Sequence, residues 1–329
     1  MTMTPITEVH RLLSTQKAVR NEILVNPGNR YIEYVSADGQ MIRLPNVIRD
    51  FDASWEDVPA PSSDTTIIER EGRIYAIGQA AKTMHGKAAF DKGKLGMMFD
   101  SIFAALEPSY GQSILRVENL KIAVPDTRNL EAINEAKKLQ GTFEYTRNGQ
   151  ALIATIARVT LIEEATAAYL YGIENGLYQW SDAINGVIDF GGGTSSGRLY
   201  ASDGLMLREA SITLPGTNQL AQSIQARLLK ETAVSADLSA IMDGIESGSY
   251  QIGRNGASFV THFASTRDLW LDDIRSKAIS QWNPYLNDLG EVLLVGGSAS
   301  LATSLEERTK GRFKVASNPQ DITILGMGL

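Results

Sequence analysis

The sequence predicts an α/β fold made of two domains. The chain has 329 residues, which is long enough for two separate hydrophobic cores. Runs rich in β-forming residues alternate with helical patterns along it, and the strand-rich pattern that opens the chain returns near residue 186. Hydrophobic residues make up 43% of the chain and charged residues 21%, a composition that excludes wholesale disorder.

In the first half, turn residues separate short β-rich runs. Asn26-Pro27-Gly28-Asn29 and Ala37-Asp38-Gly39 divide three expected strands, and the Pro-, Ser- and Asp-rich residues 50–65 predict a loop. The expected elements are strands at 22–25, 31–35 and 41–44, a hairpin at 67–77, helices at 79–86 and 96–107, a strand at 120–124, a helix at 130–139, a hairpin around 147–149, a strand at 155–161 and a helix at 163–175.

The second half repeats the opening pattern and then becomes mainly helical. A buried strand at 186–190 precedes a glycine turn, and strands at 198–201 and 206–212 follow on either side of Asp203-Gly204. We interpret this as an internal duplication in which each domain opens with a three-stranded meander. The remaining expected elements are helices at 217–231, 235–246 and 265–284, a strand at 293–295 and a helix at 301–309.

Charge and composition exclude several function classes. Lys and Arg number 31 against 38 Asp and Glu, so the net charge of −7 argues against direct nucleic-acid binding and suits a cytoplasmic protein. The absence of Cys excludes disulfides, thiolate zinc sites and cysteine nucleophiles. The three His residues lie far apart in the sequence and have no metal-ligand spacing.

The N-terminal residues have a short apolar stripe. Ile6, Val9, Leu12 and Leu13 follow helical spacing, whereas no run reaches the roughly 18 apolar residues of a membrane span. The stripe could be an amphipathic helix that contacts a membrane or a partner. A weakly docked tail is the preferred alternative, and the absence of a secretory apolar core predicts no export.

The strongest local motif is an acidic residue at the end of a buried strand, followed by glycines. Because glycines have no Cβ, the N–H groups of Gly191, Gly192 and Gly193 can approach phosphate oxygens closely. Asp189 can hold Mg²⁺ through water, and the Thr194 hydroxyl can donate to a phosphate. The alternative is an ordinary glycine-rich hairpin turn. A dinucleotide fingerprint and a P-loop fit worse, because strand residues follow and no Gly-Lys-Ser/Thr is present.

A second glycine motif follows the expected strand at 293–295. There Gly296-Gly297-Ser298 forms a tight turn, against whose bare backbone a base or ribose could lie. Strand–Gly–Gly–helix junctions are common in α/β proteins, so this motif is weak alone and more specific in combination with the first.

The order and spacing of these motifs resemble the actin-like ATPase superfamily, and most of all the bacterial and archaeal plasmid-segregation actins of the ParM type. The resemblance covers residues 22–329. Residues 189–194 match the second phosphate loop, 296–298 the adenosine loop, 163–168 the first connecting helix and 318–327 the second connecting helix. Residues 72–80 resemble a first-domain hairpin that leads into a helix.

The resemblance implies an actin-like (ribonuclease H-like) two-domain fold with a nucleotide cleft between the domains. Residues 1–21 would be a tail, 22–162 domain I, to which 318–329 return, and 163–317 domain II. Glu164 and Asp189 would be catalytic, with Glu164 orienting the attacking water. Without the resemblance, Glu163 and Glu164 would simply favour a helix N-terminus. Lys230 and Glu231 are candidates for ribose or base contacts.

The first phosphate loop departs from the family pattern. Asn26-Pro27-Gly28-Asn29-Arg30 stands where Asp-x-Gly is usual, and Glu33 falls about where a Lys is expected. Asn26 keeps an oxygen but loses a charge worth about 4 kcal/mol at 4 Å and an effective dielectric constant of about 20. We therefore expect Asn26, Gly28 and Asn29 to bind nucleotide, with slow hydrolysis. Arg30 either contacts a phosphate or is solvated.

The function implied is a nucleotide-dependent, filament-forming ATPase that uses ATP or GTP with Mg²⁺. Its partners would be further copies of itself and an adaptor protein that links the filament to plasmid DNA, with no direct nucleic-acid contact. A role as a prokaryotic cytoskeleton fits equally. The alternatives are a non-hydrolysing nucleotide-binding scaffold and a small-molecule phosphotransferase, for which Asp126 is a conceivable base.

Overall fold

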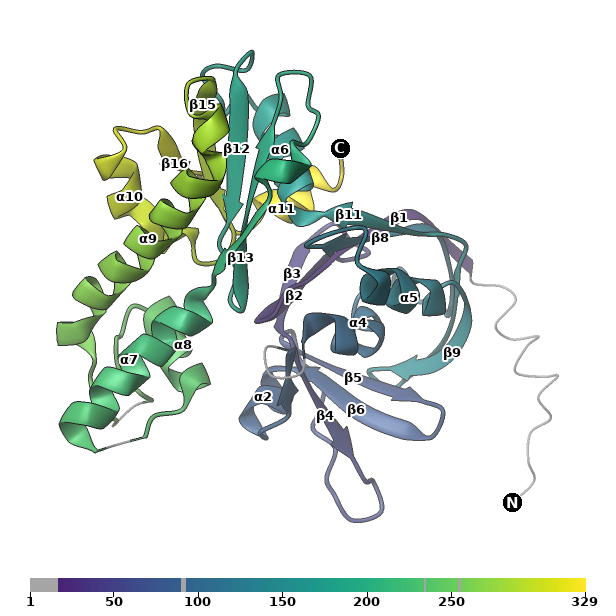
Figure 1. The fold of residues 1–329 in the computed structure, drawn as a ribbon. Helices are drawn as coiled ribbons and strands as arrows, with labels where there is room; N and C mark the ends of the chain where they lie inside the picture. Colours follow the sequence, from purple (N-terminus) through teal and green to yellow (C-terminus); the bar gives the residue numbers. More distant parts are fainter. Residues whose placement is uncertain (1–16, 90–92, 234, 254–255) are drawn as a thin grey trace, which may run out of the picture. The chain divides into compact units, whose positions relative to one another are not determined.

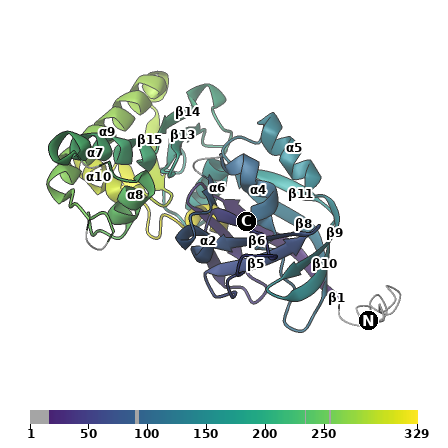
Figure 2. The same cartoon turned by 90° about the horizontal axis from the view of Figure 1, so that it is seen from below.

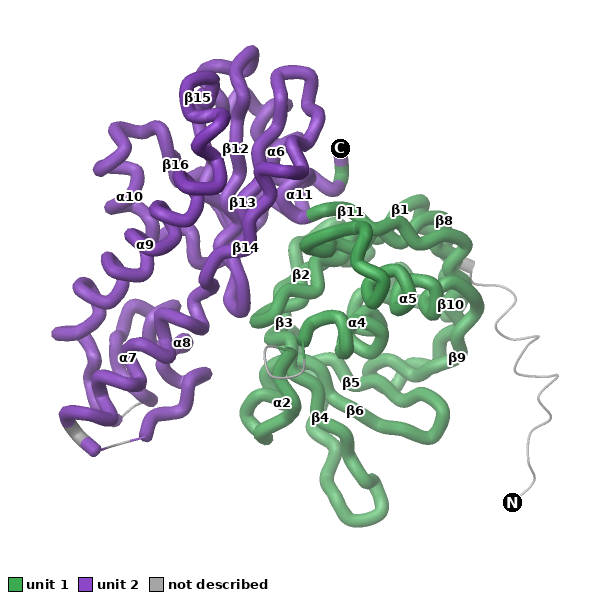
Figure 3. The backbone as a smooth tube through the Cα atoms, viewed as in Figure 1, with its two compact units in different colours: residues 1–163, 328 green, residues 164–327, 329 purple. Residues whose placement is uncertain are grey.

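The computed structural model describes residues 17–89, 93–233, 235–253 and 256–329. The chain forms two compact units, which consist of residues 1–163 with 328 and residues 164–327 with 329 (Figure 3). The amphipathic stripe expected near the N-terminus lies outside the described residues. No helix in the described part of the chain is long and apolar enough to cross a bilayer.

Unit 1 is built on one large mixed sheet that curls around α4 and α5 (Figure 1). Its core gathers apolar residues of the sheet, such as Ile23 and Ile122, around Phe103. The strands are β1 (Lys17–Pro27), β2 (Tyr31–Val35), β3 (Met41–Pro45), β4 (Val47–Phe51), β5 (Thr65–Arg70), β6 (Arg73–Gly78), β7 (Lys87–Ala88), β8 (Ile114–Val124), β9 (Gly141–Arg147), β10 (Gln150–Ile156) and β11 (Val159–Glu163). The helices are α2 (Gln79–Thr83), α4 (Lys94–Ile102) and α5 (Leu130–Lys138).

Unit 2 has a five-stranded sheet, and α7, α8 and α9 pack together beyond it (Figure 2). The strands are β12 (Ile184–Asp189), β13 (Thr194–Tyr200), β14 (Ile212–Pro215), β15 (Leu289–Val295) and β16 (Phe313–Val315). The helices are α6 (Glu164–Glu174), α7 (Thr217–Thr232), α8 (Leu238–Glu246), α9 (Val260–Trp282), α10 (Thr303–Arg308) and α11 (Ile322–Gly326), with 3₁₀ turns at Arg208–Ala210, Asn283–Tyr285 and Ala299–Ala302.

The two units repeat one strand topology, which confirms the predicted duplication. In each unit three antiparallel strands open the sheet, β1 to β3 and β12 to β14. A later strand then pairs in parallel with the first, and another pairs in parallel with that one. The matching orders are β3-β2-β1-β8-β11 and β14-β13-β12-β15-β16. Every residue of β15 is buried, as expected for a strand flanked by parallel neighbours inside a layered α/β unit.

On the edge away from β1, strand β8 pairs with two different strands in turn. Its first residues pair with β10 and its last residues with β11, and the chain changes partner at residues 157–158. There the N–H of Ala157 donates to the Val117 carbonyl at 2.9 Å, and the N–H of Leu120 donates to the Arg158 carbonyl at 2.9 Å. The single strand predicted at 155–161 is therefore two strands.

Three further expectations differ from the structure. Strand β1 begins at Lys17 rather than at residue 22. Residues 47–51 form the strand β4, whose last two residues fall in the loop expected at 50–65. The strand predicted at 206–212 is a single bridge at Met206 followed by a 3₁₀ turn, and β14 starts only at Ile212. The Trp282 indole N–H donates to the Ala210 carbonyl at 2.8 Å, a long-range contact that short-range periodicity cannot show.

Helices α6 and α11 approach each other very closely in unit 2. A Cβ built on Gly326 would overlap the backbone of Ala167, so only glycine fits there. The expected connecting helices 163–175 and 318–327 thus appear as α6 and the short α11, packed together.

Candidate functional site

The two glycine turns of unit 2 lie side by side at one edge of its sheet. Asp189 ends β12 and pairs with Val295, which ends the parallel neighbour β15. Beyond the strands, the Phe190 N–H donates to the Val295 carbonyl at 2.8 Å, and the Ser298 N–H donates to the Phe190 carbonyl at 3.2 Å. Because parallel strands carry their carboxyl ends to the same edge, residues 189–194 and 296–298 form one continuous surface.

Gly296 makes room for the Asp189 carboxylate. Its φ is +90°, which side chains rarely adopt, and a Cβ built there would overlap Oδ1 of Asp189. That Cβ would also lie 2.8 Å from the Phe190 carbonyl oxygen. Gly297 next to it is exposed and has no atom closer than 3.6 Å to such a Cβ. Only the first of the two glycines is therefore required by the packing.

The first turn of α7 completes this edge. The backbone N–H groups of Thr217 and Asn218 donate to the carbonyls of Gly191 and Gly192, at 3.2 and 2.8 Å. The Thr217 hydroxyl donates to the Ser298 hydroxyl at 2.5 Å and so links the helix to the second glycine turn. Sequence reasoning did not identify Thr217, although it is the first residue of the helix expected at 217–231.

The glycine turn can accept an anion. Its carbonyls at 191 and 192 point to α7, whereas in the described part of the chain the N–H groups of Gly191, Gly192 and Gly193 have no backbone hydrogen bond. Thr194 is exposed beside them. Successive unsatisfied N–H groups form the concave donor set that binds phosphate oxygens. This arrangement fits a phosphate held by a hairpin turn.

The equivalent turn of unit 1 joins β1 to β2. The Gly28 N–H donates to the Asn26 carbonyl at 3.0 Å, and Asn29 follows in the same turn. Asn46, which is fully buried just after β3, donates its Nδ2 to the Gly28 carbonyl at 2.7 Å and its N–H to the Arg30 carbonyl at 2.8 Å. Sequence reasoning also missed Asn46, because its role depends on the register of the meander.

Asn26 itself is engaged by a buried carboxylate. Its Nδ2 donates to Oε2 of Glu33 at 3.0 Å, and Nε of Arg43 donates to Oε1 of Glu33 at 3.0 Å. Glu33 is only 4% exposed. The Oδ1 of Asn26 is buried and has no hydrogen-bond partner among the described residues. Arg30 places its guanidinium 5.9 Å from the ring centre of Tyr31.

Comparisons with known proteins identify the fold. No family model matches the sequence, and no curated protein matches it significantly. The structure is similar to that of the archaeal actin homologue Ta0583, with a TM-score of 0.75 at 14% identity over 94% of this chain and 98% of the other. A ParM from a 15-stranded Clostridium botulinum filament gives a TM-score of 0.70 at 14% identity, over 95% and 98% of the two chains. The chain has the actin-like fold. Ta0583 is also known in complex with ADP, a structure similar at a TM-score of 0.73 and 14% identity, over 94% of this chain and 98% of the other.

The acidic residues Glu163 and Glu164 are adjacent in the sequence but belong to different elements and different units. Glu163 is the last residue of β11 in unit 1, is buried, and accepts a hydrogen bond from the Thr127 hydroxyl at 3.1 Å. Glu164 begins α6 in unit 2 and is partly exposed. Asp126, the conceivable phosphotransfer base, binds the guanidinium of Arg128 at 3.0 Å and caps its own turn through the Arg128 N–H at 2.9 Å.

Lys230 and Glu231 lie away from the glycine turns. Both are in the last turns of α7, about 20 Å along the helix from Thr217 at 1.5 Å per residue. Oε2 of Glu231 pairs with Nε2 of His262 at 2.8 Å. The structure therefore does not bring these two residues to the edge that carries Asp189.

Asp189 is suited to a cation that is coordinated mainly by the oxygens of a bound nucleotide and by water, with little contribution from protein side chains. Among the described residues, no group of three or more His, Asp and Glu side chains is placed to hold a metal ion. Mg²⁺ accepts such a site, because it commonly takes one or two protein carboxylates and completes its shell with phosphate oxygens and water. The Asp189 side chain at the glycine turn is suited to that role.

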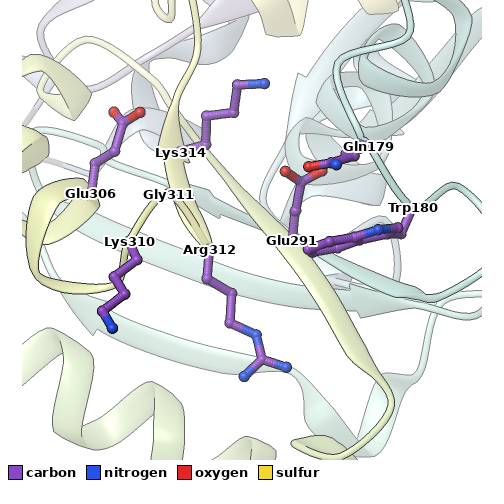
Figure 4. A pocket seen from close by; sticks show the side chains of 8 residues that line it. All are labelled: Gln179, Trp180, Glu291, Glu306, Lys310, Gly311, Arg312 and Lys314. Carbon is purple, nitrogen blue, oxygen red and sulfur yellow. The ribbon is translucent and has the colours of Figure 1, made fainter.

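A separate pocket of about 420 Å³ lies at the opposite end of the strands in unit 2 (Figure 4). Its charged side chains do not converge on one point, and several are bonded to the protein's own backbone. Glu306 accepts from the Val315 N–H at 3.0 Å, Glu291 accepts from the Gln179 N–H, and Arg312 donates to the Leu286 carbonyl at 3.2 Å. The pocket begins near the start of β15, whereas the glycine turns follow its end, so it is not part of the candidate nucleotide site.

Proposed function

We propose that the protein is a nucleotide-dependent, filament-forming actin-like ATPase, acting in plasmid segregation or as a prokaryotic cytoskeleton. The observation that carries this proposal is the shared edge of unit 2, where Asp189, the glycine turn after it and the turn at 296–298 adjoin each other. The ADP complex of Ta0583 and the ParM filament, both of the same fold, support nucleotide binding and self-association.

The residues of this chain have distinct tasks in the proposed reaction. The N–H groups of Gly191 to Gly193 and the Thr194 hydroxyl bind the phosphates of ATP or GTP. Gly296, Gly297 and Ser298 give the nucleoside a flat backbone surface. Asp189 holds the water shell of Mg²⁺, which offsets phosphate charge when bound. Glu164 accepts a hydrogen bond from the attacking water and orients it.

Within unit 1, Asn26, Gly28, Asn29 and Arg30 form the second phosphate turn of the proposal. The Oδ1 of Asn26, which is buried without a hydrogen-bond partner in the described part of the chain, supports this assignment, because such an oxygen costs free energy unless a ligand or water satisfies it. Lys230 and Glu231, in the last turns of α7, would contact the ribose or base of the nucleotide.

The net charge of −7 makes a direct contact with DNA unfavourable, so in a plasmid role the filament would act through an adaptor protein. Head-to-tail repetition of one interface produces an open filament rather than a closed ring when the rotation does not close. Sedimentation and electron microscopy with and without Mg-ATP test this part directly. Filaments only with nucleotide are expected, and a protein that stays unassembled in both conditions contradicts it.

Nucleotide binding and hydrolysis are tested with two substitutions. Asp189→Asn should weaken Mg-ATP binding about 10- to 100-fold, because it removes a carboxylate from the metal's surroundings. Glu164→Gln should leave binding intact and slow phosphate release about 100-fold. Asp182→Asn is the matched control, because Asp182 is an exposed residue just before the opposite end of the strand that carries Asp189. Equal effects of the two Asp substitutions would refute the site.

A non-hydrolysing scaffold is the second candidate, and Asn26 is the observation that favours it. A neutral amide replaces the charge that the family pattern carries at this turn. In that case the wild type and Glu164→Gln would both bind nucleotide and assemble, and neither would release phosphate.

A further inference from the structure

Asn26 and Glu33 face each other in the same way as Asp189 and Ser196 in the other unit. In the β1–β2 pair, Asn26 stands opposite Glu33, and in the β12–β13 pair Asp189 stands opposite Ser196. The number of residues between the partners is therefore the same in both meanders. In unit 2 the carboxylate is on the first strand, and in unit 1 it is on the second.

The chemistry of Glu33 fixes the orientation of the Asn26 amide. An ionised carboxylate only accepts hydrogen bonds, so the atom of Asn26 that lies 3.0 Å from Oε2 must be the NH₂ nitrogen. Glu33 cannot easily turn away, because it is buried and Nε of Arg43 holds its other oxygen at 3.0 Å. The amide oxygen is thereby directed away from Glu33 and lies buried without a partner in the described residues.

We propose that Glu33 is a positioning residue, which orients the side-chain amide of Asn26 and disfavours a carboxylate at that position. It holds Nδ2 of Asn26 and presents Oδ1 as a neutral acceptor to the hydration shell of the nucleotide-bound cation. This inference rests on the proposed nucleotide-binding function. It explains why the turn carries Asn rather than Asp, since a carboxylate at position 26 would place two negative oxygens about 3 Å apart in a buried site, where like charges strongly disfavour ionisation.

The proposal predicts that Asn26→Asp alone, which introduces the Asp of the family pattern, does not give a stable, Mg²⁺-dependent phosphate turn. Asn26→Asp should lower the melting temperature of the ligand-free protein, because the new carboxylate faces Glu33 without a donor between them. The double variant Asn26→Asp with Glu33→Gln should recover that loss, since the Gln amide can donate to the new carboxylate. The double variant should also depend more strongly on Mg²⁺ than the wild type.

The experiment is a double-substitution cycle on the full chain. The wild type, Asn26→Asp, Glu33→Gln and the double variant are titrated with a fluorescent ATP analogue, once with Mg²⁺ and once with EDTA, and their ligand-free melting temperatures are recorded. The ratio of the affinity measured with Mg²⁺ to the affinity measured with EDTA should be about tenfold higher in the double variant than in the wild type. It should not rise in Asn26→Asp. Glu22→Gln is the control for loss of one carboxylate on β1, where Glu22 pairs with Lys121 at 3.0 Å.

Three results overturn the inference. The first is an Asn26→Asp variant that melts like the wild type and gains the Mg²⁺ dependence by itself. The second is strict additivity of the two substitutions in both measurements. The third is coupling in melting temperature with an unchanged affinity ratio in the double variant, which would show that the pair is merely structural. If the wild type binds no nucleotide with or without Mg²⁺, the proposed function fails first and this inference falls with it.

Discussion

The turns after β1 and β12 occupy equivalent places in two copies of one topology, yet different means hold them. In both, the carbonyl two residues after the matching position, Asn26 or Asp189, accepts a hydrogen bond from a residue that lies within two positions of the end of the third strand. For Gly28 that donor is the side chain of Asn46, and for Gly191 it is chiefly the backbone N–H of Thr217. The turn of unit 1 thus depends on one buried residue, whose side chain binds Gly28 and whose N–H binds Arg30, whereas the turn of unit 2 is fixed chiefly by the backbone of a long helix.

This difference predicts which substitutions each turn tolerates. A turn held by backbone bonds is insensitive to most side chains but sensitive to any Cβ that enters its close contacts. A turn held by one amide is sensitive to loss of that amide. Three comparisons of variants test the distinction.

The largest effect is expected at the second glycine turn of unit 2. Gly296→Ala should destabilise the protein by about 3 kcal/mol, because the new Cβ meets Asp189 and because φ is +90°. Gly297→Ala should change stability by less than about 0.5 kcal/mol, since the nearest atom lies 3.6 Å from its Cβ. Chemical denaturation of both variants decides the matter, and comparable losses would contradict the contact between the turns.

A smaller loss is expected in unit 1. Asn46→Ala removes the donor to the Gly28 carbonyl and should cost about 1–3 kcal/mol of unfolding free energy. Asn29→Ala, an Asn substitution within the turn itself, serves as the matched control and should have little effect on stability. Denaturant midpoints measure both. If Asn29→Ala costs as much as Asn46→Ala, the side chain of Asn46 does not hold this turn.

The smallest effect is expected at the start of α7. Thr217→Val removes the hydroxyl that donates to Ser298 at 2.5 Å but keeps the backbone N–H bond to Gly191. A cost of about 1 kcal/mol is expected, and Thr217→Ser should retain most of the stability. A cycle with Ser298→Ala isolates the hydroxyl pair, and full additivity would show that the two hydroxyls are not coupled.

The sequence was informative wherever a local pattern decided the structure. The glycine turns, the meander spacing and the α6 helix could be predicted because turn chemistry and periodicity act over a few residues. The roles of Asn46 and Thr217 could not, because each depends on which carbonyl lies opposite after the third strand. The seven-position offset between Asn26 and Glu33, repeated between Asp189 and Ser196, was visible and would have pointed to their pairing.

The errors have a common physical origin in long-range pairing. Residues 157–158 interrupt a β-rich run because β10 and then β11 pair with successive parts of β8. The local sequence of that run does not indicate where one pairing ends and the next begins. Likewise, residues 208–210, which lie inside the strand expected at 206–212, form a 3₁₀ turn, whose Ala210 carbonyl accepts a hydrogen bond from the Trp282 indole far along the chain.

The change of partner along one edge of β8 separates the strands that both units share from the strands that only unit 1 has. Its last residues belong to the five-strand arrangement that both units share, beside the end of β1 that carries Asn26. Its first residues carry the β9–β10 hairpin and, through it, the additional strands of unit 1. Those strands are attached at the end of β8 remote from Asn26, so their length and surface can diversify without altering the geometry of the turn.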